Sequence, residues 1–447
     1  CEYQFLEICT QFQISMQNED PESSAFWLQQ LFYYTSLNII SDSIPPFTVP
    51  DIIFIIANEN EKFSLETRKY ALDVVYNFLD GILDISDYFV QCNAVSLFSV
   101  FILDDDNLCP LHLPALKCLK KIAGHCEDCQ ACVCQNLNFK FIDKWLAELA
   151  ESKIVNEIHI EIFSIFKNIS KFLLDYPTYD EDGVDNEEEI NLVTVCFNSF
   201  LSFMDYSDEL LRISLLGIGN IMNFQSRSDW YKIYENSQLS ENLPRYLKYG
   251  DFTIIQTSLL VIASIYRQKQ NTPSPNFRQI VGLLHHNDEE NESSSSSVRY
   301  YAAVAINEII KDDAEFIHLI IKCDYLIIIH EIYDKSSYDV KQQISISLNE
   351  IAINGYPEDK VQIIQNDFLK YFIEMVDNGD DEQILQTIRA LDVLFSGNYK
   401  KNCYEWFRNS PNYTNIFNLS EYPGDEVRNR AIDFLNEFFP ISPTSPY

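Results

Sequence analysis

Apolar residues recur along the chain with the spacing of one buried helix face. Three segments show it most clearly: VRYYAAVAINEI (298–309), VKQQISISLNEI (340–351) and VRNRAIDFLNEF (427–438). When the Glu of each Asn-Glu pair is the origin, apolar or small residues occupy positions −10, −6, −3, −2 and +1. A stripe of this period predicts a helix that buries one side. The same helix therefore occurs at least three times.

This template also fits 210–221, 254–265 and 383–394, and more loosely the helices around Asn77, Lys121 and Asn168. The nine origins that result are spaced by 42–52 residues and lie at 77, 121, 168, 220, 264, 308, 350, 393 and 437. A second apolar run between them contains a break, which predicts a short helix followed by a longer one. Two or three helices in a period near 44 are typical of armadillo or HEAT repeats. We predict an all-α, right-handed superhelical armadillo solenoid of about nine to ten repeats over residues 1–447.

The predicted solenoid has two ends and two interruptions. Outermost repeats must cover exposed apolar faces, so 1–40 are expected to form N-terminal capping helices and 397–440 a C-terminal capping repeat. The acidic segment 175–190 and the serine-rich segment 287–297 are expected to be solvent-exposed loops. A phosphorylated or partner-binding serine run is the alternative for the second segment.

Charge narrows the choice of partners. The chain has 32 Lys and Arg against 67 Asp and Glu, a formal charge of −35, which repels nucleic acid and anionic membranes and attracts basic proteins. A merely well-solvated acidic surface is the alternative. The longest apolar stretch, 89–103, is interrupted by Gln91 and Asn93 and is too short to cross a bilayer. We expect a soluble intracellular protein with no nucleic acid or membrane partner.

Signatures of catalysis are missing from the sequence. It contains no GxxxxGK[ST], GxGxxG, GxSxG or HExxH motif, so neither an enzyme nor a cofactor is expected. The best metal candidate is His125 with Cys126, Cys129, Cys132 and Cys134, because sulfur and nitrogen suit zinc. Four cysteines within nine residues are an unusual zinc spacing, so free thiols are favoured and no metal site is assigned.

The segment 342–395, followed by EVRNRAIDFLNEFF (426–439), resembles the last armadillo repeats of importin alpha. Further similar segments are 214–224, 265–288 and 41–56. The resemblance implies a nuclear import adaptor, present in cytoplasm and nucleus, that binds basic extended cargo peptides, the nuclear localisation signals, in an acidic concave groove. It also implies importin beta as a partner if a basic segment precedes Cys1. An armadillo protein-interaction scaffold without a transport role is the alternative.

In the importin alpha family, Trp-x-x-x-Asn pairs line the groove, with indoles against lysine stems and Asn amides on the peptide backbone. None of the four tryptophans of this chain lies at a Trp position, and Lys117 and Lys121 occupy one such pair. The resemblance implies peptide contacts from the residues at six other pairs: Asp73, Asn77, Ser164, Asn168, Leu216, Asn220, Leu260, Ser264, Val304, Glu308, Ile346 and Glu350.

Overall fold

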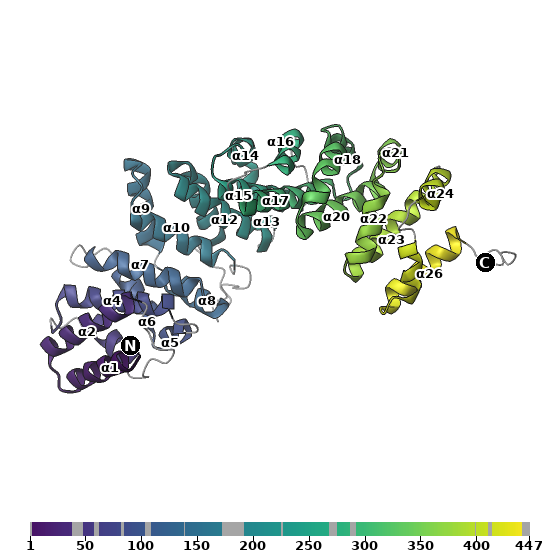
Figure 1. Ribbon diagram of the computed structural model, residues 1–447. Helices are drawn as coiled ribbons and strands as arrows, with labels where there is room; N and C mark the ends of the chain where they lie inside the picture. Colours follow the sequence, from purple (N-terminus) through teal and green to yellow (C-terminus); the bar gives the residue numbers. More distant parts are fainter. Residues whose placement is uncertain are drawn as a thin grey trace, which may run out of the picture. The chain divides into compact units, whose positions relative to one another are not determined.

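The computed structural model describes residues 2–37, 48–57, 62–81, 85–102, 109–137, 139–171, 192–224, 227–267, 275–286, 292–397, 399–409 and 414–439. These residues form helices and turns but no strand (Figure 1). The chain divides into two compact units, Cys1–Ser237 and Gln238–Tyr447. Among the helices described, none combines the length and apolar composition needed to cross a membrane.

The first unit is a stack of helices in which α2, α4, α7, α10 and α12 pack in turn, each against the next (Figure 1). Shorter helices lie between them. The helices are α1 (Glu2–Gln17), α2 (Pro21–Ser36), α3 (Thr48–Ala57), α4 (Leu65–Gly81), α5 (Ile85–Gln91), α6 (Ala94–Phe101), α7 (Cys109–Ala123), α8 (Glu127–Asn136), α9 (Phe139–Ser152), α10 (Glu157–Ile169), α11 (Leu192–Phe203), α12 (Asp208–Phe224) and α13 (Arg227–Glu235).

The second unit repeats this plan, with α15, α17, α20, α23 and α26 packed in the same successive way. Its helices are α14 (Leu239–Tyr246), α15 (Phe252–Arg267), α16 (Phe277–Gly282), α17 (Glu292–Ile310), α18 (Ala314–Ile321), α19 (Tyr325–Ile332), α20 (Tyr338–Asn354), α21 (Pro357–Gln365), α22 (Leu369–Asn378), α23 (Asp381–Ser396), α24 (Lys400–Asn409), α25 (Thr414–Asn418) and α26 (Asp425–Phe438).

Each of the nine sequence segments that match the template forms a helix in the structure. We call α4, α7, α10, α12, α15, α17, α20, α23 and α26 the stacked helices. Their template stripes are buried, as shown by Val298 and Ile306 in α17 and by Ile344 and Ile351 in α20, which are all at most 1% exposed. The predicted all-α solenoid of armadillo-like repeats is therefore confirmed.

A left-handed aspartate produces the predicted break between the first two helices of a repeat. Asp324 separates α18 from α19 with φ 66°, and Asp367 separates α21 from α22 with φ 63°. Aspartate adopts this conformation more readily than most residues, because its short side chain bonds locally. The chain turns there without a glycine, and a second helix follows the first.

The serine run departs from the sequence prediction. Residues 292–297 are not a loop but the first turns of α17, and the side chain of Ser295 is fully buried. Serine is a mediocre helix former, yet packing of one side of the helix outweighs a small propensity cost. The remainder of that predicted loop, 287–291, and the whole of 175–190 lie outside the described residues.

Candidate peptide-binding surface

The predicted peptide contacts share one side of the stacked helices. Residues four apart in a helix lie on the same face, so template positions −8, −4 and 0 are aligned, with −7 beside them. We call this side the candidate face. Each of six stacked helices contributes two predicted residues to it, and successive packing brings the residues of neighbouring helices side by side within each unit.

The asparagines on the candidate face bind the chain itself. Asn168 donates from Nδ2 to the carbonyl oxygen of Lys120, 3.0 Å away, and Asn220 donates to the carbonyl of Lys167 at 3.1 Å. Asn77 donates in the same way to Thr35 Oγ1 at 3.0 Å. Asn168 and Asn220 thus bind carbonyl oxygens in the last turns of α7 and α10, where the Lys120 carbonyl also accepts from the backbone N–H of Gly124 and the Lys167 carbonyl from Ser170 Oγ. These three asparagines therefore join α4 to α2, α10 to α7 and α12 to α10.

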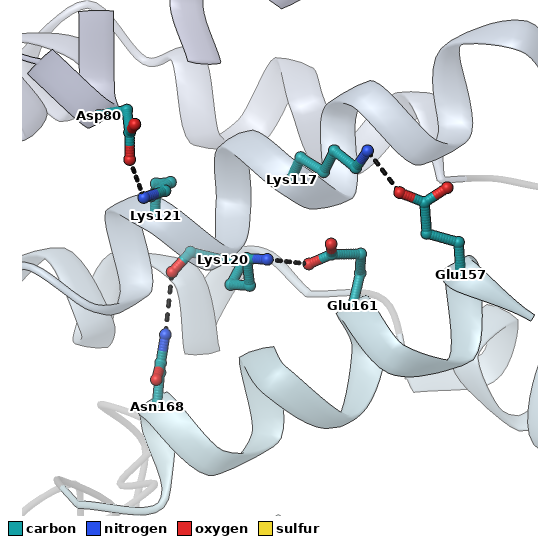
Figure 2. Close-up of polar contacts among 7 residues, drawn as sticks. All are labelled: Asp80, Lys117, Lys120, Lys121, Glu157, Glu161 and Asn168. Carbon is teal, nitrogen blue, oxygen red and sulfur yellow. Dashed lines mark hydrogen bonds and ion pairs between the residues drawn. The ribbon is translucent and has the colours of Figure 1, made fainter. Parts of the chain in front are cut away.

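Three lysines of α7 neutralise acidic groups on either side of them, as Figure 2 shows. Lys117 Nζ lies 2.5 Å from Glu157 Oε1, and Lys120 Nζ lies 2.6 Å from Glu161 Oε2, both in α10. Lys121 pairs with Asp80 of α4. These pairs contribute little to stability because most are solvent-accessible. They do reduce the negative charge of the candidate face, because the ammonium groups of the chain's own lysines pair with the carboxylates there.

Two pKa shifts describe this part of the surface. Burial lowers the pKa of Lys117, but the hydrogen bond and charge of Glu157, with the charge of Glu161, outweigh it and raise the pKa above its usual value. Burial also raises the pKa of the predicted contact Asp73, although nearby lysines lower it. The carboxyl of Asp73 is thus held in a position that disfavours its charge.

The two acidic residues predicted to contact the peptide in the second unit also bind groups of neighbouring repeats. Glu308 Oε1 accepts from Arg267 of α15 at 3.0 Å, and Glu350 Oε1 accepts from the backbone N–H of Asp312 and from Asn354 Nδ2. Ser264 is buried and donates to the carbonyl of Leu260 within α15. The Arg267–Glu308 and Asp312–Glu350 contacts join neighbouring repeats, as the asparagines do in the first unit, whereas the Ser264 and Asn354 contacts stay within one helix.

The apolar predictions form a line across the second unit. Leu260 in α15 and Val304 in α17 are partly exposed, and Ile346 in α20 is 38% exposed. Leu216 in α12 is partly exposed in the first unit, whereas Ser164 in α10 is buried and contributes little surface. Each partly exposed apolar side chain sits four residues before an engaged polar group.

Sequence reasoning missed a cavity of about 580 Å³ on the same face, between α17 and α20. Hydroxyl and amide groups surround it, for example Ser296 Oγ, which donates to Ser337 Oγ at 3.2 Å. Gln342 Nε2 donates to Tyr338 and to Gln383 Oε1 of α23, which extends the polar row. The lining residues occupy template positions −8, −7 and beyond: Ser293, Ser296, Ser297, Tyr300, Tyr301, Ser337, Asp339, Gln342 and Gln343. The polar side chains at position −8 of successive helices, such as Tyr300 and Gln342, were the feature of the sequence that could have predicted this cavity.

Comparison with known proteins finds a solved structure of similar fold but assigns the chain to no family. No protein-family model and no curated protein matches the sequence. Among solved structures, an engineered protein is similar over 96% of this chain and 98% of its own, with a TM-score of 0.71 and 15% identity. A designed armadillo repeat protein aligns with 54% of this chain and 99% of its own, with a TM-score of 0.45 and 19% identity. The first of these similarities concerns the fold alone, and neither shows membership of the importin alpha family.

Proposed function

We propose that the chain is a non-catalytic protein-interaction scaffold, and that it binds an extended, basic peptide segment of a partner protein on the candidate face of α15, α17, α20 and α23. The cavity between α17 and α20 is the observation that carries this proposal. It lies beside the line of apolar side chains that ends at Ile346, in a chain with a formal charge of −35.

The chemistry of the cavity suits an extended backbone. Serine and tyrosine hydroxyls and glutamine amides each donate and accept hydrogen bonds, as the N–H and C=O groups of a peptide require. The rings of Tyr300 and Tyr301, together with Ile346, offer apolar surface to the aliphatic stems of lysine or arginine. Asp339 supplies an exposed carboxylate at the rim for a cationic end group.

The first unit is a poorer candidate for the same ligand. Lys117 and Lys121 place two positive charges on its candidate face, Lys120 lies beside that face, and all three already occupy nearby carboxylates. A basic peptide would have to displace these pairs and would meet like charges. Binding is therefore assigned to the second unit.

A scaffold is favoured over the narrower role of nuclear import adaptor. The family's tryptophans are missing from the sequence, and the asparagine amides that would hold a peptide backbone bind neighbouring helices instead. Import activity, importin beta as a partner, and residence in both cytoplasm and nucleus remain predictions. Import of a fluorescent protein carrying the bound peptide into nuclei of permeabilised cells would distinguish the two roles.

Fluorescence anisotropy with a lysine-rich peptide tests the proposal directly. We expect binding that weakens as salt rises, and no binding by a peptide with glutamates in place of the lysines. Asp339→Lys should weaken the affinity about tenfold, which corresponds to about 1.4 kcal/mol. Glu358→Lys in α21 makes the same charge change at an exposed position that is not among the cavity-lining residues, and should stay within about twofold.

Circular dichroism must show that both variants remain folded. Equal affinities of the Asp339→Lys and Glu358→Lys variants would contradict the assignment of the cavity. Affinity that does not depend on peptide charge or on salt would contradict the basic nature of the ligand.

A further inference from the structure

A cluster of metal-ligating side chains lies in the first unit, where α5, the turn after α7 and the start of α8 meet. Asp87 in α5 places Oδ1 3.4 Å from Cys126 Sγ and 3.3 Å from Cys129 Sγ. His125 Nε2 lies 4.0 Å from the same carboxylate oxygen. One oxygen, two sulfurs and one ring nitrogen thus converge from two repeats.

The backbone fixes both sulfurs in one helical turn. Cys126 is the N-cap of α8, and its Sγ accepts from the backbone N–H of Cys129. Residues three apart at the start of a helix face the same way, so the two sulfurs point to one side. That side faces α5, since ligand atoms of Asp87, Cys126 and Cys129 all lie within 4.8 Å of one another.

We propose that Asp87, His125, Cys126 and Cys129 bind one zinc ion. Zinc in proteins takes four ligands in a tetrahedron, with Zn–S distances of about 2.3 Å and Zn–O and Zn–N distances of about 2.0–2.2 Å. Two ligands of such a tetrahedron are about 3.5 Å apart, which is close to both sulfur–oxygen distances here. The His125 ring has to move inward, and its side chain is 26% exposed at the surface.

This ligand set differs from the one that the sequence alone suggests. Cys132 and Cys134 lie further along α8, and Cys132 instead receives a weak contact from Asn136 Nδ2 at 3.8 Å. Neither belongs to the group of ligand atoms that converge on Asp87. The carboxylate replaces them as the third ligand.

The proposed ion would join two repeats. Asp87 belongs to a short helix beside α4, whereas Cys126 and Cys129 begin α8, which follows α7. A closed four-ligand site of this kind stabilises a fold and leaves no open position for catalysis. The zinc site is thus independent of the peptide-binding surface of the second unit.

Metal analysis of the reduced full chain tests the proposal. We expect about one zinc per chain after dialysis against excess free zinc, and a cobalt-substituted form with near-ultraviolet thiolate-to-cobalt absorption. The double variant Cys126→Ser with Cys129→Ser should lose both signals. Asp87→Asn should weaken zinc affinity at least tenfold, whereas the matched control Cys132→Ser should keep the stoichiometry and the spectrum.

A second measurement separates loss of the site from loss of the fold. Zinc should raise the melting temperature of the wild-type chain and of Cys132→Ser, because the ion binds the folded state, and should leave the double variant unchanged. Circular dichroism without zinc should show the same helix content in all variants. Zinc retained by the double variant, or no zinc bound by the reduced wild-type chain, would overturn the proposal. A Cys126–Cys129 disulfide that persists under reducing conditions would do so as well.

Discussion

Gly217 lies in α12 at the point where the ring of Phe200 from α11 packs on the backbone. A Cβ atom added there would stand 2.2 Å from Phe200 Cζ and 2.3 Å from Cε2, far inside ordinary van der Waals contact. The ring has little room to withdraw, because it is fully buried and packs against Phe163 and Phe166 at centroid distances of 6.0 and 6.3 Å. Gly217→Ala is therefore expected to destabilise the first unit.

Two effects of opposite sign set the size of this loss. Overpacking a dense core costs about 1–3 kcal/mol, and a clash of more than 1 Å with a ring held on two sides belongs in the upper part of that range. Alanine in a helix interior is about 1 kcal/mol better than glycine, which offsets part of the cost. The expected net decrease in the free energy of unfolding is about 1–2 kcal/mol.

Urea denaturation combined with hydrogen exchange measures the change, since a repeat array need not unfold in one step. The amides of α11 and α12 should exchange faster in Gly217→Ala, and the urea midpoint should fall. Gly282→Ala in α16 is the matched control, because nothing lies within 4 Å of a Cβ at that position. It should be neutral or slightly stabilising. If Gly217→Ala were as stable as the control, the close packing of Phe200 on α12 would be wrong.

Three further predictions concern the candidate face of the first unit. Asn220→Ala removes the hydrogen bond to the carbonyl of Lys167, so urea denaturation should show a free energy of unfolding lower by about 1 kcal/mol and the peptide affinity should not change. A loss of affinity without a loss of stability would contradict the structural role of the amide. Burial raises the folded-state pKa of Asp73 above the unfolded value of 3.8, so its contribution to stability is highest below pH 3.8 and falls as pH rises through the folded-state pKa. Asp73→Asn should therefore melt at a higher temperature than wild type at pH 7 but at the same temperature near pH 3, and calorimetry showing an equal difference at both pH values would refute the shift. Replacing Lys117 and Lys120 together by glutamine should free two carboxylates, so that titration calorimetry detects a second lysine-rich peptide per chain; one peptide per chain would show that the lysines do not block the first unit.

The stacked helices could be predicted from the sequence because burial repeats with their own period. Val340, Ile344, Leu348 and Ile351 mark the buried side of α20 whatever lies next to it, and all four are at most 1% exposed. The break between the two shorter helices was also visible. Its cause, the left-handed Asp324, was not, because many residues can end a helix.

The loop predicted over the serine run failed for a different reason. Residues 293–297 have a low-complexity composition that usually predicts irregular structure, and each serine has only a modest helix propensity. In the structure Ser295 is buried while Ser293 and Ser296 line the cavity. Small hydroxyl side chains thus allow close helix packing on one side and leave polar groups on the other. Propensity alone does not contain this information.

The contacts of the candidate site could not be predicted from the template. Template positions assign a side chain to a face, but they do not say which group from the next repeat will meet it. Asn168 was predicted to hold a peptide backbone, and it meets the Lys120 carbonyl, which lies 48 residues away in the sequence. Lys117 would count as an exposed cation without the knowledge that Glu157 faces it.

In a repeat array the chemical neighbour of a residue lies about one period away. Ser296 meets Ser337, 41 residues further on, and Cys126 meets Asp87, 39 residues back. A motif search confined to adjacent residues grouped the cysteines of α8 with each other, and so it left out the carboxylate that completes the donor set. Since successive repeats pack in order, pairing each candidate ligand with residues 38–48 positions away recovers both the zinc ligands and the polar groups of the cavity. The period that predicts the fold is therefore also the distance at which its sites should be sought.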